Sequence, residues 1–288
     1  MPGYLYARAQ DQWEIAGAPA RSSGPDLSVT TGKWLNTNSE SLGITRVISS
    51  IRDEALRLQP FGASAEGLCN WGEVKVGQVY ADSVSSGRAM AFTTIYDFGF
   101  MQSHLQANVN LGLLVLAAFN TFRDGSGRSN YFSREFYRQV DASTSDWVGP
   151  APGDHGFARA EEQVPSRAPA PLDPKLLVGS WQNTNRQSKG VAHLRVSRAG
   201  ALSVFGAAQP SPVAWGEVTC EWFAKDPAST EAMAFSATYN LGFMQTHVQA
   251  NVKQGVLVVA WFTQFNDDSG RSNYFSREFY YREDERES

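Results

Sequence analysis

The chain has 288 residues, of which 42% are hydrophobic and 19% are charged, so it is long enough to bury one large core or two medium ones. A net charge of −4 and the lack of a dense basic stripe argue against nucleic acid as a partner. No apolar run could span a bilayer and no signal-like segment opens the sequence, so we expect no membrane partner and a cytoplasmic location. Cys69 and Cys220 are too few for a disulfide framework, and we expect free, packed thiols.

An internal repeat organises the sequence. AMAFTTIYDFGFMQSHLQANV at Ala89–Val109 returns as AMAFSATYNLGFMQTHVQANV at Ala232–Val252, and SGRSNYFSREFY occurs unchanged at Ser126–Tyr137 and Ser269–Tyr280. The repeated unit is far longer than a solenoid or propeller repeat, which indicates two whole homologous domains.

We expect four segments in chain order. They are an N-terminal leader without regular structure at 1–30, a first repeat at 31–140, a linker rich in Pro, Gly and Ala at 141–174, and a second repeat at 175–284.

Apolar and polar residues alternate with period two inside each repeat, and turn residues recur regularly, which is typical of an all-β meander. In the first repeat the expected strands are Gly32–Asn36, Gly43–Ile51, Ala55–Phe61, Trp71–Tyr80, Ala89–Asp97, Phe100–Val109, Leu113–Phe122 and Ser129–Arg138. Short hairpins place such strands side by side, and closing the sheet removes its exposed edges. The predicted fold is therefore all-β, with two tandem up-and-down antiparallel barrels of about eight strands each.

Each repeat opens with Gly-x-Trp-x-Asn, at Gly32–Asn36 and Gly179–Asn183, and carries arginines on its last strand, Arg134 and Arg138 in the first repeat and Arg277 and Arg282 in the second. This pattern resembles the calycin superfamily of lipocalins, fatty-acid-binding proteins and avidins. The resemblance implies that an arginine of the last strand covers the tryptophan, for which Arg134 and Arg277 are our candidates over Trp34 and Trp181, and that Asn36 and Asn183 help to hold a ligand. A serine that avidins place four residues after the asparagine is Glu40 or Gln187 here, so biotin is not implied.

A polar row lies on one face of a strand in each repeat. It consists of Gln102, His104, Gln106 and Asn108 in the first repeat, and of Gln245, His247, Gln249 and Asn251 in the second. Either the row points into the barrel as a polar floor for a ligand, or it faces solvent or the sister barrel while the apolar row fills the core. The following strand is apolar on both faces, which favours a covered outer face.

Acid–base chemistry without a cofactor is one use of these residues. His104 and His247 are the candidate catalytic groups, with Tyr96 and Tyr239 as further proton carriers. Asp97 is a candidate base, and because Asn240 replaces it in the second repeat, only the first barrel would then be active. The alternative is that Asp97 is simply a turn residue at a strand end. One repeated histidine is too few for a metal site, and no glycine-rich phosphate loop is present, so we expect neither a metal nor another cofactor.

The unchanged segment SGRSNYFSREFY has two interpretations. It leads from a tight turn into the last strand, where closure of the barrel alone would restrict its sequence. The alternative is that Arg128/Arg271, Asn130/Asn273 or Tyr131/Tyr274 also contact a ligand at the barrel rim.

Three functions are consistent with these features. The first is a barrel that binds a small, partly apolar molecule, with or without cofactor-independent cyclisation or isomerisation. The second is a two-site carbohydrate-binding module, and the third is a structural or assembly protein. We expect a small-molecule ligand and packing of one barrel on the other, and a homodimer stays open.

Overall fold

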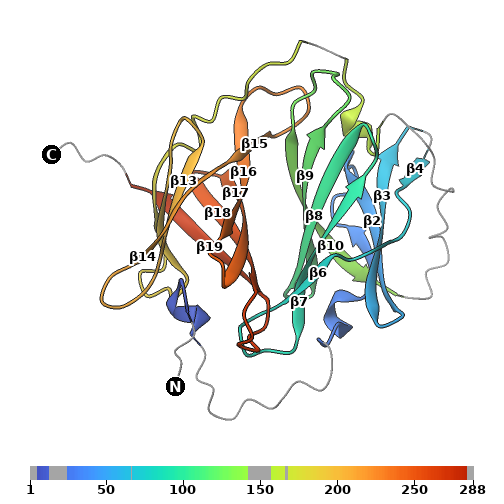
Figure 1. Ribbon diagram of the computed structural model, residues 1–288. Helices are drawn as coiled ribbons and strands as arrows, with labels where there is room; N and C mark the ends of the chain where they lie inside the picture. The colour runs from blue at the N-terminus through green and yellow to red at the C-terminus, as the bar shows by residue number, and fades with distance from the viewer. Residues whose placement is uncertain (1–4, 13–24, 66, 142–156, 166–167, 284–288) are drawn as a thin grey trace.

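The computed structural model describes residues 5–12, 25–65, 67–141, 157–165 and 168–283. The fold is all-β, with a closed ring of ten strands and further strands outside it (Figure 1). Short 3-10 turns occur at η1 (Ala9–Asp11), η2 (Ser28–Thr30) and η3 (Ala160–Glu162). Among the described residues, no helix is long and apolar enough to cross a membrane.

The strands follow the sequence repeat closely. The first repeat contains β1 (Gly32–Asn36), β2 (Ile44–Arg52), β3 (Ala55–Ser64), β4 (Gly67–Asn70), β5 (Val74–Lys75), β6 (Gln78–Ala81), β7 (Ala89–Asp97), β8 (Met101–Asn110), β9 (Leu113–Phe122) and β10 (Tyr131–Val140). The second contains β11 (Gly179–Asn183), β12 (Val191–Val196), β13 (Ala201–Gly206), β14 (Val213–Thr219), β15 (Glu221–Ala224), β16 (Ala232–Asn240), β17 (Met244–Lys253), β18 (Val256–Phe265) and β19 (Tyr274–Arg282).

The closed ring combines five strands from each repeat. Strands β6 to β10 are antiparallel neighbours, and so are β15 to β19. Two short parallel contacts join the halves, between Tyr131 of β10 and Ala224 of β15 and between Tyr274 of β19 and Ala81 of β6. Strands β1 to β3 extend the sheet outward from β10, and β11 to β14 extend it from β19.

The expected pair of closed eight-stranded barrels is not confirmed, because the ring closes between the repeats. The single strand expected at Trp71–Tyr80 is wrong. Irregular backbone separates the short strands β4, β5 and β6 there, and Gly72 adopts a φ of 77°. In the second repeat the corresponding strand is interrupted at Cys220, between β14 and β15. These breaks free β6 and β15 to contact the last strand of the opposite repeat.

Each repeat nevertheless has its own apolar core. Trp34 and Trp71 lie in the first core, and Trp181, Trp215 and Trp261 lie in the second. Both cysteines are buried and neither forms a disulfide within the described residues, as expected.

The expected stacking of Arg134 and Arg277 on the core tryptophans is wrong. The guanidinium group of Arg134 lies over Phe132, and that of Arg277 lies over Phe275. Arg282 covers Trp181, at 4.8 Å from the ring centroid.

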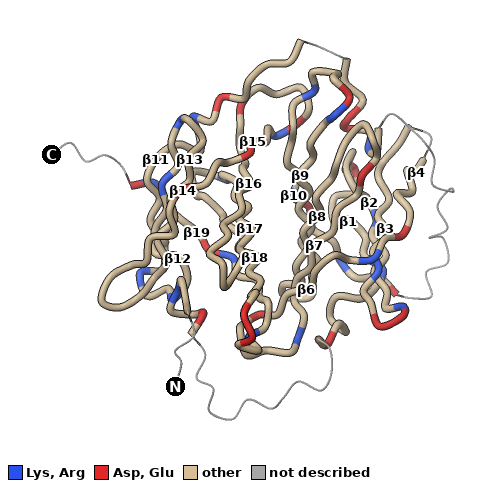
Figure 2. Tube along the Cα trace, viewed as in Figure 1, with Lys and Arg blue, Asp and Glu red and all other residues tan. Residues whose placement is uncertain are grey.

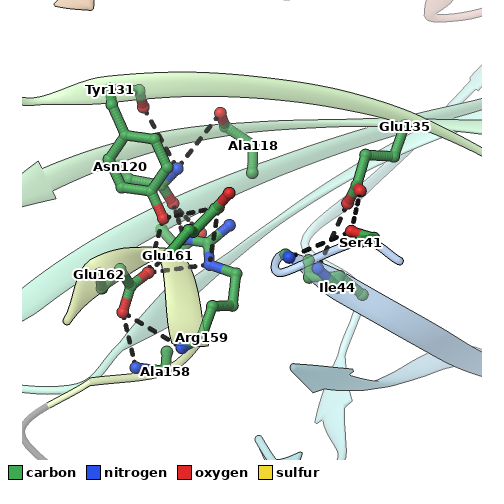
Figure 3. Close-up of polar contacts among 12 residues, drawn as sticks. Ser41, Ile44, Ala118, Asn120, Tyr131, Glu135, Ala158, Arg159, Glu161 and Glu162 are labelled. Carbon is green, nitrogen blue, oxygen red and sulfur yellow. Dashed lines mark hydrogen bonds and ion pairs between the residues drawn. The ribbon is translucent and has the colours of Figure 1, made fainter. Parts of the chain in front are cut away.

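Asn36 and Asn183 are held by glutamates of the unchanged segment. Asn36 donates through Nδ2 to Glu135 at 2.9 Å and to the carbonyl of Ile44 at 2.8 Å. Ser41 Oγ also donates to Glu135, as Figure 3 shows. The same arrangement surrounds Glu278 in the second repeat. These asparagines therefore fix the loop after the first strand.

Candidate functional site between the repeats

The two rows on β8 face different environments. Met101, Leu105 and Ala107 belong to the core of the first repeat. The polar row points the other way, toward the opposite repeat, and the His104 and His247 rings lie 4.8 Å apart between their centroids. The polar rows of the two repeats therefore meet inside the ten-stranded ring.

Apolar contacts flank this polar centre on both sides. Phe119 and Phe132 of the first repeat pack on Phe223 of the second, and Tyr80 of the first packs on Phe262 of the second. The outer face of β9 is thus covered by the second repeat.

Both central histidines are neutral at pH 7. Burial lowers the pKa of His104 to about 4, and burial together with His104 lowers that of His247 to about 3. His247 pairs through Nδ1 with Thr238 Oγ1 at 2.9 Å and through Nε2 with Gln249 Nε2 at 3.2 Å. Bases with such low pKa values are poor proton acceptors near neutral pH.

These shifts predict acid sensitivity. The unfolded chain binds protons on histidine near pH 6.5 while the folded chain does not, so stability is complete above that pH and is lost as the pH falls toward the two folded-state values. We expect wild type to lose about 2–4 kcal/mol more than a His104→Gln/His247→Gln variant between pH 7 and pH 4. Urea unfolding at both pH values measures the difference. An equal loss in both proteins would contradict the prediction.

A cavity of about 470 Å³ opens beside this polar centre, between the two repeats. Its positive groups are Arg134 and Arg277, from equivalent positions of the two repeats, with Lys253 exposed at the edge. Its apolar lining consists of Phe132, Phe136, Met233, Val252, Val258 and Phe279. No Asp or Glu is among the lining residues that the structure describes.

The two arginines repel each other. Burial, followed by the proximity of Arg277, lowers the pKa of Arg134 to about 9, and burial lowers that of Arg277 to about 10. Both are therefore charged at pH 7. Among the described residues neither forms an ion pair with an acid, and Arg277 Nη2 donates to Asn108 Oδ1 at 2.7 Å.

Several buried polar atoms around the cavity make no hydrogen bond with the described residues. Those on cavity-lining residues are the Nε atoms of Arg134 and Arg277 and Oδ1 of Asn251, while Nε2 of Gln106 and Oε1 of Gln249 belong to the polar rows and do not line the cavity. Buried polar groups in folded proteins are almost always paired, so these unpaired atoms mark the region between the repeats as incompletely satisfied.

Charged residues are scarce on the strands that face each other here. Figure 2 shows β8, β9, β17 and β18 almost free of charge, with Lys253 at the end of β17 as the exception in their sequences. The paired arginines thus stand in otherwise uncharged surroundings, which strengthens their field.

The structure brings together His104, His247 and the ends of both polar rows with Arg134 and Arg277, whereas other predicted site residues lie elsewhere. The buried hydroxyls of Tyr96 and Tyr239 donate to the backbone carbonyls of Leu58 and Leu202, and burial raises the pKa of both tyrosines.

Asp97 lies at a turn, where it accepts from Gly99 N and pairs with Arg123 at 3.0 Å. Gln102 and Gln245 are half-buried at the start of β8 and β17. The proposed catalytic set is therefore not assembled at one point.

Sequence reasoning missed Phe136 and Phe279. They are 40% and 48% exposed although they are large and apolar, and both line the cavity. The signal was available, because both belong to the unchanged SREF run and stand two residues after an arginine.

Comparison with family models, curated proteins and solved structures gives no match to this chain. Within the described residues, no group of three or more His, Cys, Asp and Glu side chains could hold a metal ion. The chemistry of the cavity is therefore the observation on which a function can be argued.

Proposed function

We propose that the protein binds a small anionic molecule with an apolar body in the cavity between its repeats. The observation that carries this proposal is the pair Arg134 and Arg277, two partly buried arginines brought together without an acidic partner among the cavity-lining residues. Holding two like charges in a mostly buried site costs free energy, and an anion placed between them would offset that cost.

The geometry supports a carboxylate, sulfonate or phosphate head group. Guanidinium groups donate in a fork that matches such oxygens. The apolar wall supplies the other half of the recognition, with Phe136 and Phe279 partly exposed at the cavity. The ligand class is thus an amphipathic anion.

Binding is supported better than catalysis. A cyclase or isomerase would use the histidines as acid or base, but their lowered pKa values make them weak in either role at pH 7. Tyr96, Tyr239 and Asp97 lie in other contacts. As part of the same proposal, each repeat is a calycin-like barrel that has opened to share a ring with its partner, and Arg282 over Trp181 supports this relationship.

The test is a fluorescence titration with anilinonaphthalene sulfonate, which joins an anionic group to an aromatic body. We expect saturable binding to wild type, weakened roughly tenfold to a hundredfold by Arg134→Met or Arg277→Met, since a hydrogen bond to a charged group contributes about 1.5–3 kcal/mol.

Arg138→Met is the matched control, because Arg138 is exposed on the same strand and does not line the cavity. It should bind the probe as wild type does. Equal affinity in all four proteins would overturn the proposal.

A further inference from the structure

Two short segments outside the predicted repeats resemble each other. Ala-Arg-Ala-Gln-Asp-Gln at Ala7–Gln12, the first arm, corresponds to Ala-Arg-Ala-Glu-Glu-Gln at Ala158–Gln163, the second arm. Each forms a 3-10 turn, η1 or η3, whose last residue is an acid that accepts from the backbone at its start. The leader was expected to lack regular structure, and this turn corrects that expectation.

Each arm docks on the repeat that it does not directly precede. In Figure 1 the blue η1 lies beside the yellow and orange strands of the second repeat. Ala9 N donates to Ala207 O at 2.6 Å, and Trp215 Nε1 donates to Ala7 O at 3.1 Å. In the first repeat, Trp71 Nε1 donates to Ala158 O of the second arm at 2.9 Å.

The arginine of each arm is completely buried in the receiving repeat. Arg8 pairs with Asp11 at 3.0 Å. Figure 3 shows the corresponding pair of the second arm, in which Arg159 lies 2.8 Å from Glu162. The Arg8 guanidinium lies 5.1 Å from the Trp215 ring and 5.2 Å from the Tyr274 ring.

Arg159 lies at the same two distances, 5.1 and 5.2 Å, from Trp71 and Tyr131. We call the surface of each repeat that receives an arm its groove. The two grooves therefore hold the arginine and acid of the arm in the same way.

A glycine in each groove makes room for the arm backbone. A Cβ on Gly206 would collide with the carbonyl oxygen of Ala7, and one on Gly62 would collide with that of Ala158. Neither glycine has a positive φ that would itself require glycine. Close approach of the arm is thus the physical reason for glycine at both positions.

The unchanged segment provides the rest of each groove. Arg271 Nη1 donates to the carbonyls of Leu5 and Asp11, and Tyr274 OH donates to Asp11 at 2.5 Å. In the first repeat, Arg128 Nη1 donates to Glu162 O and Tyr131 OH donates to Glu162 at 2.7 Å. Recognition of the arm is therefore one reason why SGRSNYFSREFY occurs twice without change.

We propose that each repeat carries a peptide-binding groove for Ala-Arg-Ala-x-Asp/Glu, and that the partner it fits is the arm of a second copy of this chain. The contacts involve only the arm and the receiving repeat, so an arm from another copy would make the same ones. Tethering then decides the occupant through effective concentration, and two copies can exchange arms. This proposal does not depend on the ligand cavity.

The experiment uses the full chain with its own first arm disabled, Arg8→Ala/Asp11→Ala, and a labelled peptide of residues 5–12. Fluorescence anisotropy should show saturable binding to this variant and at least tenfold weaker binding to wild type, whose groove is occupied. Adding Gly206→Ala should abolish binding, as should a peptide carrying Arg8→Ala.

Absence of binding to the folded double variant would overturn the proposal, and so would equal binding when Gly206→Ala is added. If the double variant fails to fold, the single Arg8→Ala chain serves instead, since it retains the capping acid. Circular dichroism and thermal unfolding verify folding in each case.

Discussion

Glu162→Ala is expected to reduce the free energy of unfolding by about 3–5 kcal/mol, because it leaves the buried Arg159 without its closer charged partner and with only Glu161 at 3.7 Å. Glu162 accepts from Arg159 Nε at 2.8 Å, from Ala158 N at 2.6 Å and from Tyr131 OH at 2.7 Å. All three donors would remain buried without this acceptor. Urea unfolding at pH 7 measures the loss.

Glu161→Gln is the matched control on the same turn. Burial raises the pKa of Glu161, so the charged carboxylate lowers the stability of the folded state at pH 7. Protonation of Glu161 at lower pH removes this destabilisation. The first arm has Gln10 at this position, where its amide donates to Tyr274 OH at 2.9 Å. Glu161→Gln should therefore be neutral or stabilising, and any gain should shrink as the pH falls. Equal losses in the two variants would contradict the assigned roles.

Glu278→Ala should cost about 2–4 kcal/mol, since several donors lose one shared acceptor. The donors are Asn183 Nδ2 at 2.9 Å, Ser188 Oγ at 2.5 Å, Val191 N at 3.0 Å and Tyr280 OH at 2.9 Å. They connect the first strand of the second repeat, the loop after it and the last strand. Thermal unfolding should show a melting temperature lower by roughly 5–15 °C.

Glu283→Ala is the control for this loss. Glu283 is exposed and accepts from Gln182 Nε2 at 3.1 Å, so its removal should change stability by no more than about 0.5 kcal/mol. A Glu278→Ala variant as stable as Glu283→Ala would show that the shared acceptor is dispensable.

The sequence predicts individual strands well because alternation and turn residues are local signals. Gly32–Asn36, Ala89–Asp97 and Leu113–Phe122 match their predicted bounds. Closure of the ring was missed because it depends on parallel contacts between residues far apart in the sequence, such as Tyr131 and Ala224. Short hairpins favour closure of the sheet within each repeat, and they give no indication that strands of different repeats pair.

The site was predicted in part. Alternation placed His104, Gln106 and Asn108 on one face, but it does not say which face is the core when the next strand is apolar on both sides. The arms were missed because the shared residues are few and the second arm lies in a segment of linker-like composition. The common role of the two arms becomes visible only in the structure, where their backbone packs over Gly62 and Gly206.

NMR of the arginine Nε–Hε groups during titration with anilinonaphthalene sulfonate tests directly whether the anion binds between the repeats. We expect the signals of Arg134 and Arg277 to shift together and saturate, while that of the exposed Arg138 stays unchanged. Saturable binding that leaves both cavity signals unmoved would place the ligand elsewhere and contradict the proposed site.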